Sequence, residues 1–160
     1  METEELRNGI LANKIFIYPT DTIYGLGCNA ENKEAVNKIK QIKIRDSDKP
    51  LSIIAPSIDW IEENLMVDCN LQEYLPGPYT IILKNKNPDF LSWVSKEDSL
   101  GVRIPNNDYC RQIQEIGIPF ITTSVNLAGE SFALKISEIK SKIKNKVNFI
   151  IPAKDESKLS

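Results

Sequence analysis

The block Tyr18–Gly27, which reads YPTDTIYGLG, constrains the fold of this chain more than any other part of its sequence. It directly follows the apolar run Ile15–Ile17, which predicts a buried strand. Pro19 is expected to end that strand, because its nitrogen has no hydrogen to donate to a sheet. Four hydrogen-bonding side chains then precede Gly25 and Gly27, where the backbone could turn and approach a ligand closely. A well-capped structural turn is the alternative interpretation.

The rest of the chain alternates strands and helices irregularly, without a repeat or a linker. Apolar runs bounded by turn residues predict strands over 15–18, 51–55, 79–83, 100–104, 120–125 and 147–151. Helical spacing predicts helices over 3–13, 31–43 (capped by Asn29), 58–66 (capped by Ser57), a helix to about 116 (capped by Asn107 or Asp108), and 137–144. We therefore expect one α/β (α+β) domain over residues 1–160, with a twisted, mostly mixed open sheet and flanking helices.

Composition narrows the chemistry that this chain can perform. It contains no His, which excludes Ser–His and Cys–His nucleophilic pairs and His-ligated zinc. A net charge of −2 argues against a strongly basic nucleic-acid-binding surface, although not against a local basic groove. Cys28, Cys69 and Cys110 lack metal-type spacing, so we interpret them as reduced structural cysteines, with a functional thiol at Cys28 as the alternative.

The sequence also indicates the cellular compartment of the protein. No apolar stretch approaches the length of a membrane span, and the acidic N-terminus lacks the pattern of a signal peptide. Together with the reduced cysteines, these features predict a cytoplasmic protein without a membrane partner.

Later segments carry polar side chains that could meet the first block. Lys43 and Arg45, followed by Lys49, could converge on one anion if this segment is extended. Surface cations at a helix C-terminus are the alternative. Arg103 lies within an apolar strand, where it must be paired or face a cavity, because burying an unpaired charge is costly.

Two more segments complete this set. Thr122, Ser124 and Asn126 alternate at the end of a strand and therefore share one face, which could line a pocket unless local turns satisfy it. The segment 76–80, PGPYT, predicts a rigid entry to a strand. Each signal alone is weak, but their joint occurrence in this order is specific.

Together these blocks resemble the YrdC/TsaC family, the threonylcarbamoyl-AMP synthases. The matching motifs are residues 19–27, 43–45, 50–51, 76–80, 101–105 and 124–129. The resemblance implies a YrdC-like fold with a concave, positively charged groove. It implies an ATP-binding nucleotidyltransferase of tRNA modification, which makes threonylcarbamoyl-AMP and pyrophosphate from L-threonine, bicarbonate or CO₂, and ATP. Mg²⁺ would enter with ATP, without a metal tightly held by protein ligands.

The resemblance also implies roles for individual residues. Lys43 and Arg45 would be the catalytic cations that hold the triphosphate. Ser124 and Asn126 would complete the ATP site. The implied threonine site comprises Thr20, Thr22, Lys49, Arg103 and Thr122. The implied partners are the threonylcarbamoyl-transferase proteins of the same pathway, with tRNA as a further candidate.

The chain departs from the family pattern in three places. Asp46 follows Arg45 where the family usually has proline, and residues 131–134 replace the usual Ser-Pro-Thr. The sequence ends at Ser160, whereas the family continues through a Ser-Thr-containing strand and a later arginine that helps to bind ATP. We therefore expect a single domain without the final strand of the family, and ATP affinity is the property that this difference affects most.

Three other functions stay open on the sequence alone. The first is an RNA-binding or ribosome-maturation module of the same fold without catalysis, against which the acidic balance argues. The second is a carbamoyl-transfer domain like that of hydrogenase-maturation proteins, which are longer chains with paired cysteines that this sequence lacks. The third is an inactive paralogue.

Overall fold

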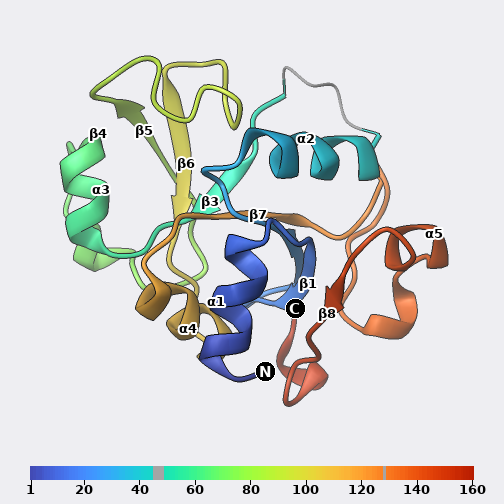
Figure 1. The fold of residues 1–160 in the computed structure, drawn as a ribbon. Helices are drawn as coiled ribbons and strands as arrows, with labels where there is room; N and C mark the ends of the chain where they lie inside the picture. The colour runs from blue at the N-terminus through green and yellow to red at the C-terminus, as the bar shows by residue number, and fades with distance from the viewer. Residues whose placement is uncertain (45–48, 128) are drawn as a thin grey trace.

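The computed structural model describes residues 1–44, 49–127 and 129–160. Its strands form one sheet in the order β4-β5-β6-β3-β7-β2-β1-β8 (Figure 1). The strands are β1 (Phe16–Pro19), β2 (Tyr24–Gly27), β3 (Ser52–Ile54), β4 (Leu65–Met66), β5 (Ile81–Asn85), β6 (Ser99–Arg103), β7 (Phe120–Ser124) and β8 (Phe149–Ile150). The α-helices are α1 (Thr3–Leu11), α2 (Lys33–Ile42), α3 (Ile58–Asn64), α4 (Asp108–Ile116) and α5 (Ser141–Lys144).

The sheet is mixed. β3 pairs with β6, and β1 with β8, in parallel, whereas the other neighbouring strands pair antiparallel. Three short 3₁₀ helices complete the described elements: η1 (Leu71–Glu73), η2 (Ile136–Glu138) and η3 (Glu156–Lys158). The predicted fold class, a mixed open sheet with flanking helices, is confirmed.

Two predicted helix caps are present. The Ser57 hydroxyl accepts a hydrogen bond from the Trp60 amide at 3.0 Å at the start of α3. The Asn107 side chain accepts one from the Cys110 amide at 2.9 Å at the start of α4. Each bond satisfies an amide that has no partner within its own helix.

Three other helix predictions are wrong in part, and in the first of these Leu65 and Met66, at the end of the predicted helix 58–66, form β4. Asn32, rather than Asn29, caps α2, and Asn29 instead accepts a hydrogen bond from the Glu31 amide in the preceding turn. The predicted helix 137–144 is divided into η2 and α5. Ile139 separates the two pieces, because it adopts an extended backbone and is buried in the core.

The two faces of the sheet are covered to different extents. On one face, Leu83, Val102, Ile53 and Ile121 pack in a core with apolar residues of α2 and α3. The strand register places these four side chains on the same side. Removing this large apolar area from water is the main stabilising contribution of the fold.

The opposite face is covered only in part. Ile54 and Phe120 pack there against apolar residues of α1 and α4, which lie side by side (Figure 1). Ser52 and Thr122 pair with each other two positions further along the same strands, so they lie on this face beyond the helices. The polar part of this face is therefore left open.

The first block forms a hairpin, and its second half is a strand instead of the predicted turn. Residues Tyr24–Gly27 form strand β2, which pairs antiparallel with β1. A Cβ on Gly27 would lie 2.3 Å from the carbonyl oxygen of Ile121, and one on Gly25 would lie 2.7 Å from the Tyr18 ring. Both glycines are therefore needed for close packing within the sheet, not for a turn.

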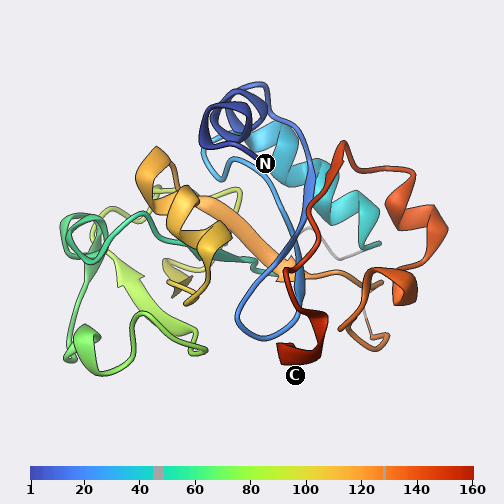
Figure 2. The ribbon, with the colours of Figure 1, turned by 90° about the horizontal axis from the view of Figure 1, so that it is seen from below.

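The end of the chain returns to this hairpin. The Ser160 amide donates a hydrogen bond to the carbonyl oxygen of Thr22 at 2.8 Å. The C-terminal segment consequently lies beside the turn between β1 and β2 (Figure 2).

We expect Gly27→Ala to lower the free energy of unfolding by about 3 kcal/mol, because the new methyl group meets a backbone carbonyl that cannot rotate away. Gly117→Ala is the control, since the site is open but has a φ of +81°, and it should lose only about 1 kcal/mol. Urea denaturation measures both values. Equal losses for the two variants would contradict the packing role of Gly27.

Candidate active site

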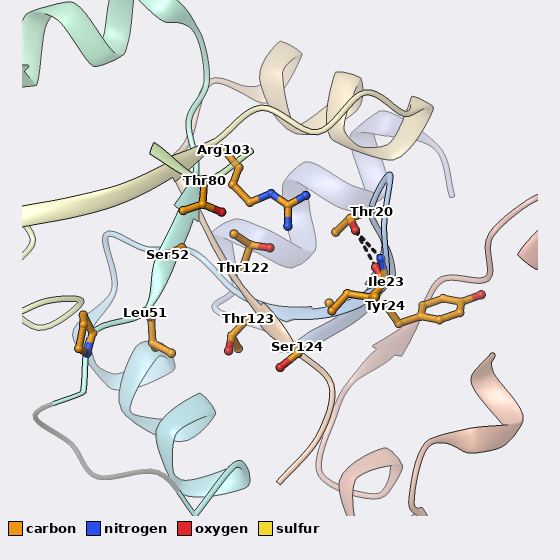
Figure 3. Close-up of a pocket in the computed structure, with 12 residues that line it drawn as sticks. Thr20, Ile23, Tyr24, Leu51, Ser52, Thr80, Arg103, Thr122, Thr123 and Ser124 are labelled. Carbon is orange, nitrogen blue, oxygen red and sulfur yellow. Dashed lines mark hydrogen bonds between the residues drawn. The ribbon is translucent and has the colours of Figure 1, made fainter. Parts of the chain in front are cut away.

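A cavity of about 190 Å³ opens on the uncovered part of the sheet (Figure 3). Its walls come from the β1–β2 hairpin, the segment that enters β3, and the strands β6 and β7. The lining residues are Thr20, Ile23, Tyr24, Gly25, Pro50, Leu51, Ser52, Thr80, Arg103, Thr122, Thr123 and Ser124. Among these described residues Arg103 alone is charged, and half are serine or threonine. Such a lining suits a small polar molecule that carries an acid group.

The hairpin turn is held by the hydroxyl of Thr20. This oxygen accepts hydrogen bonds from the amides of Thr22 and Ile23, both at 3.1 Å. It also donates to the Ile23 carbonyl oxygen at 2.6 Å (Figure 3). Thr20 is buried, so its hydroxyl fixes the turn that presents Asp21 and Thr22 to the rest of the site.

Arg103, at the end of β6, forms an ion pair with Asp21. The guanidinium Nη2 lies 3.0 Å from Asp21 Oδ1 and 3.4 Å from Thr22 Oγ1. Asp21 Oδ2 also accepts a hydrogen bond from the Asn106 amide at 3.0 Å. Both charged side chains are 13% exposed, so the pair is largely removed from water. The two sequence interpretations of Arg103, a paired charge and a charge at a cavity, are therefore both correct.

One donor of Arg103 has no partner among the described residues. Its Nε is buried and lacks a hydrogen bond within the part of the chain that the structure describes. Figure 3 shows the guanidinium directed toward the hairpin across the cavity. An unpaired buried donor is costly, so this arrangement is not the one expected of a purely structural ion pair.

A second group of predicted residues meets beside the cavity. The ammonium group of Lys43 donates to the Ser124 carbonyl oxygen at 2.6 Å and to Asn126 Oδ1 at 2.9 Å. The Ser124 hydroxyl donates to the same Asn126 oxygen at 2.7 Å. Lys43 is 1% exposed, so these contacts hold a positive charge at the edge of the protein interior. The structure thus joins residues about 80 positions apart in the sequence.

The local geometry of Lys43 differs from the prediction. It is the C-cap of α2 with helical dihedral angles, so it does not lie in an extended segment. Arg45, its predicted companion, lies outside the described residues. Lys49 is exposed and precedes Pro50, which lines the cavity. Thr122 is buried and lines the cavity directly.

The sequence did not lead us to predict three hydroxyl-bearing residues of the cavity. They are Ser52, Thr80 and Thr123. The pattern in 51–55 could have identified Ser52, because this residue is the one polar position in an otherwise apolar strand. The last part of β7 likewise carries polar residues after an apolar start. Thr80 was included in the PGPYT motif without a role in a pocket.

The cysteines do not supply a reactive group to this site. Cys28 and Cys110 are buried, and burial raises the pKa of each thiol. A thiol with a raised pKa is a poor nucleophile, so the structural interpretation of Cys28 holds. Cys69 is free and exposed, so it does not have a structural role in the core.

Among residues 1–44, 49–127 and 129–160, no group of three or more cysteine or acidic side chains is placed to bind a metal ion. The helices in these ranges are also too short or too polar to cross a membrane.

The chain belongs to the Sua5/YciO/YrdC family. The profile of that family, described as telomere recombination, matches residues 8–159. A Methanocaldococcus jannaschii protein named "Putative threonylcarbamoyl-AMP synthase" is 39% identical over 152 residues, which are 92% of this chain and 72% of that protein. A Marinobacter nauticus protein named threonylcarbamoyl-AMP synthase is 31% identical over 153 residues, with 91% and 80% covered. The family resemblance inferred from the motifs is confirmed.

The fold is shared with solved structures of the family. The structure of P. abyssi Sua5 complexed with L-threonine matches with a TM-score of 0.80 and 26% sequence identity. The match covers 96% of this chain and 48% of that chain, so this chain spans just under half of that protein's length.

We expect Asp21→Ala to lower the free energy of unfolding by about 3 kcal/mol, because it leaves the largely buried Arg103 charge without its partner. Asp108→Ala removes the exposed ion pairs with Arg111 and Lys154 and should have a much smaller effect. Thermal and urea denaturation compare the two variants. A similar loss for both would show that the Asp21–Arg103 pair is no more important than a surface ion pair.

Proposed function

We propose that this protein is a threonylcarbamoyl-AMP synthase, which converts L-threonine, bicarbonate or CO₂, and ATP into threonylcarbamoyl-AMP and pyrophosphate. The observation that carries the proposal is the small hydroxyl-lined cavity with the buried Arg103 guanidinium at its wall. The names of the two curated relatives and the L-threonine complex of P. abyssi Sua5 support the same reaction.

The cavity is the proposed site of L-threonine. Arg103 would face the carboxylate, because it lines the cavity as its one charged side chain among the described lining residues, and a guanidinium binds carboxylates well. Thr122 lines the same cavity, and Thr20 and Thr22 shape the hairpin wall. Lys49 is assigned to this site by the family pattern, from its position beside Pro50.

The nucleotide is proposed to bind beside the Lys43 group. Lys43, Ser124 and Asn126 already form one hydrogen-bonded cluster, and Arg45 is assigned to it by the family pattern. An ammonium group has three donors, and a phosphate oxygen is a stronger acceptor than the neutral oxygens of Ser124 and Asn126. Lys43 would therefore exchange one of these two acceptors for a phosphate oxygen when ATP binds.

The reaction requires alignment and charge stabilisation more than a covalent nucleophile. The threonine amine adds to CO₂ to give a carbamate, and a carbamate oxygen then attacks the α-phosphorus of ATP while pyrophosphate leaves. Such phosphoryl chemistry depends on positioning and on cations near the developing charge. Lys43 and Arg45 would supply these cations, which agrees with a chain that has no His. Mg²⁺ would arrive bound to the ATP phosphates.

The product is an activated acyl adenylate, so a second enzyme must use it. We propose that threonylcarbamoyl-transferase proteins transfer the group to tRNA in the cytoplasm.

The test is pyrophosphate release from ATP with Mg²⁺ and bicarbonate, with and without L-threonine, and mass spectrometry identifies threonylcarbamoyl-AMP. We expect release that depends on threonine, with serine a poor substitute. Lys43→Met, which conserves side-chain volume, and Arg45→Ala should each reduce turnover by at least about 100-fold. Lys38→Ala is the control, since Lys38 is exposed on the same helix.

Three results would contradict parts of this proposal. Wild-type turnover in both Lys43→Met and Arg45→Ala would exclude the proposed triphosphate site. Absence of threonine-dependent release from the folded protein, and from a chain extended past Ser160, would exclude the synthase activity. Binding to tRNA with a steep salt dependence but without turnover would instead favour the RNA-binding alternative.

A further inference from the structure

The carboxylate of Glu156 connects segments that lie far apart in the sequence. Its Oε2 accepts one hydrogen bond from the Tyr24 hydroxyl and one from the Ile136 amide, both at 2.8 Å. The Tyr24 hydroxyl in turn accepts a hydrogen bond from the Ala153 amide at 2.9 Å. A single oxygen of Glu156 therefore joins β2, the segment before α5 and the C-terminal segment.

Tyr24 transmits this contact to the threonine cavity. Its main chain lines the cavity, whereas Figure 3 shows its ring directed away from Arg103 and Thr122. The Tyr24 amide donates to the Ala133 carbonyl oxygen at 3.1 Å. Desolvation of the buried phenol raises the pKa of Tyr24 to about 12, so its hydroxyl stays protonated and able to donate at neutral pH.

The segment that carries Glu156 is itself attached at both ends. The Ala153 amide donates to the Tyr24 hydroxyl at 2.9 Å, and the Ser160 amide donates to the Thr22 carbonyl oxygen at 2.8 Å. Between these two bonds, Asp155 caps η3 by accepting a hydrogen bond from the Ser157 amide at 3.0 Å. Residues 153–160 therefore contact the hairpin at its turn, through Thr22, and at the start of β2, through Tyr24.

We propose that Glu156 is a positioning residue for the threonine site, acting through Tyr24 on the main chain of β2 that forms one cavity wall. The inference rests on the proposed synthase function and extends it to a residue that does not touch the cavity. Losing the Glu156 contacts lets β2 shift against β7 and widens the cavity beside Arg103, while the Lys43 cluster keeps its own hydrogen bonds. The affinity for threonine then falls, and that for ATP is preserved.

Glu156→Ala and Glu156→Gln form a discriminating pair. Because both hydrogen bonds end on one oxygen, the carboxamide oxygen of glutamine can accept both, whereas alanine accepts neither. We expect Glu156→Ala to raise the KM for threonine about tenfold, with kcat and the KM for ATP nearly unchanged, and Glu156→Gln to restore most of the loss. Tyr24→Phe should resemble Glu156→Ala, and the double variant should be no worse. Glu138→Ala, an exposed glutamate close in sequence to Ile136, is the matched control.

Hydrogen–deuterium exchange gives a readout that does not depend on activity. Glu156→Ala should accelerate exchange at the amides of Tyr24 and Val125, and Glu138→Ala should not. An unchanged KM for threonine in an active Glu156→Ala protein would overturn the proposal, even if its stability fell. If the wild-type protein does not turn over threonine, the proposed synthase function is wrong. Unchanged amide exchange in Glu156→Ala would separately show that Glu156 does not position β2.

Discussion

The site depends on the incomplete covering of one face of the sheet. α1 and α4 bury Ile54 and Phe120, but the same strands continue beyond these helices with Ser52 and Thr122. A sheet can leave a polar face in contact with solvent, whereas an apolar continuation would require another helix. The cavity, the ion pair of Arg103 and the hairpin wall all lie on this uncovered area. The site therefore forms where α1 and α4 leave part of one face of the sheet uncovered.

The charged side chains of the site are held in place by neighbouring protein groups instead of being surrounded by water. Arg103 is paired with Asp21, and Lys43 is surrounded by oxygens of Ser124 and Asn126. Fixed cations of this kind need little reorganisation when charge develops on a substrate, which is the main way in which a protein accelerates phosphoryl transfer. A chain without His can perform such chemistry, because the attacking and leaving groups both belong to the substrates.

Much of this arrangement could be predicted from the sequence, but only where the signal is local. Ser57 and Asn107 were identified as caps because a cap is decided by residues three positions apart. Tyr24–Gly27 was interpreted as a turn, because its glycines are explained by contacts with Tyr18 and Ile121 that only the folded sheet creates. The link between Glu156 and Tyr24 spans 132 positions and left no local pattern. The family motifs grouped Lys43 with Ser124 and Asn126 correctly in space, whereas the alternation argument placed Lys43 in an extended segment, which the structure contradicts.

The most direct test of the account is a crystal structure of the protein with L-threonine bound, accompanied by calorimetric titration of the wild-type protein and Arg103→Gln. The account predicts threonine inside the cavity beside β2 and β7, with its carboxylate within hydrogen-bonding distance of the Arg103 guanidinium, and a strong loss of affinity in the variant. Threonine bound elsewhere, or a carboxylate directed away from Arg103 with affinity unchanged in Arg103→Gln, would contradict it.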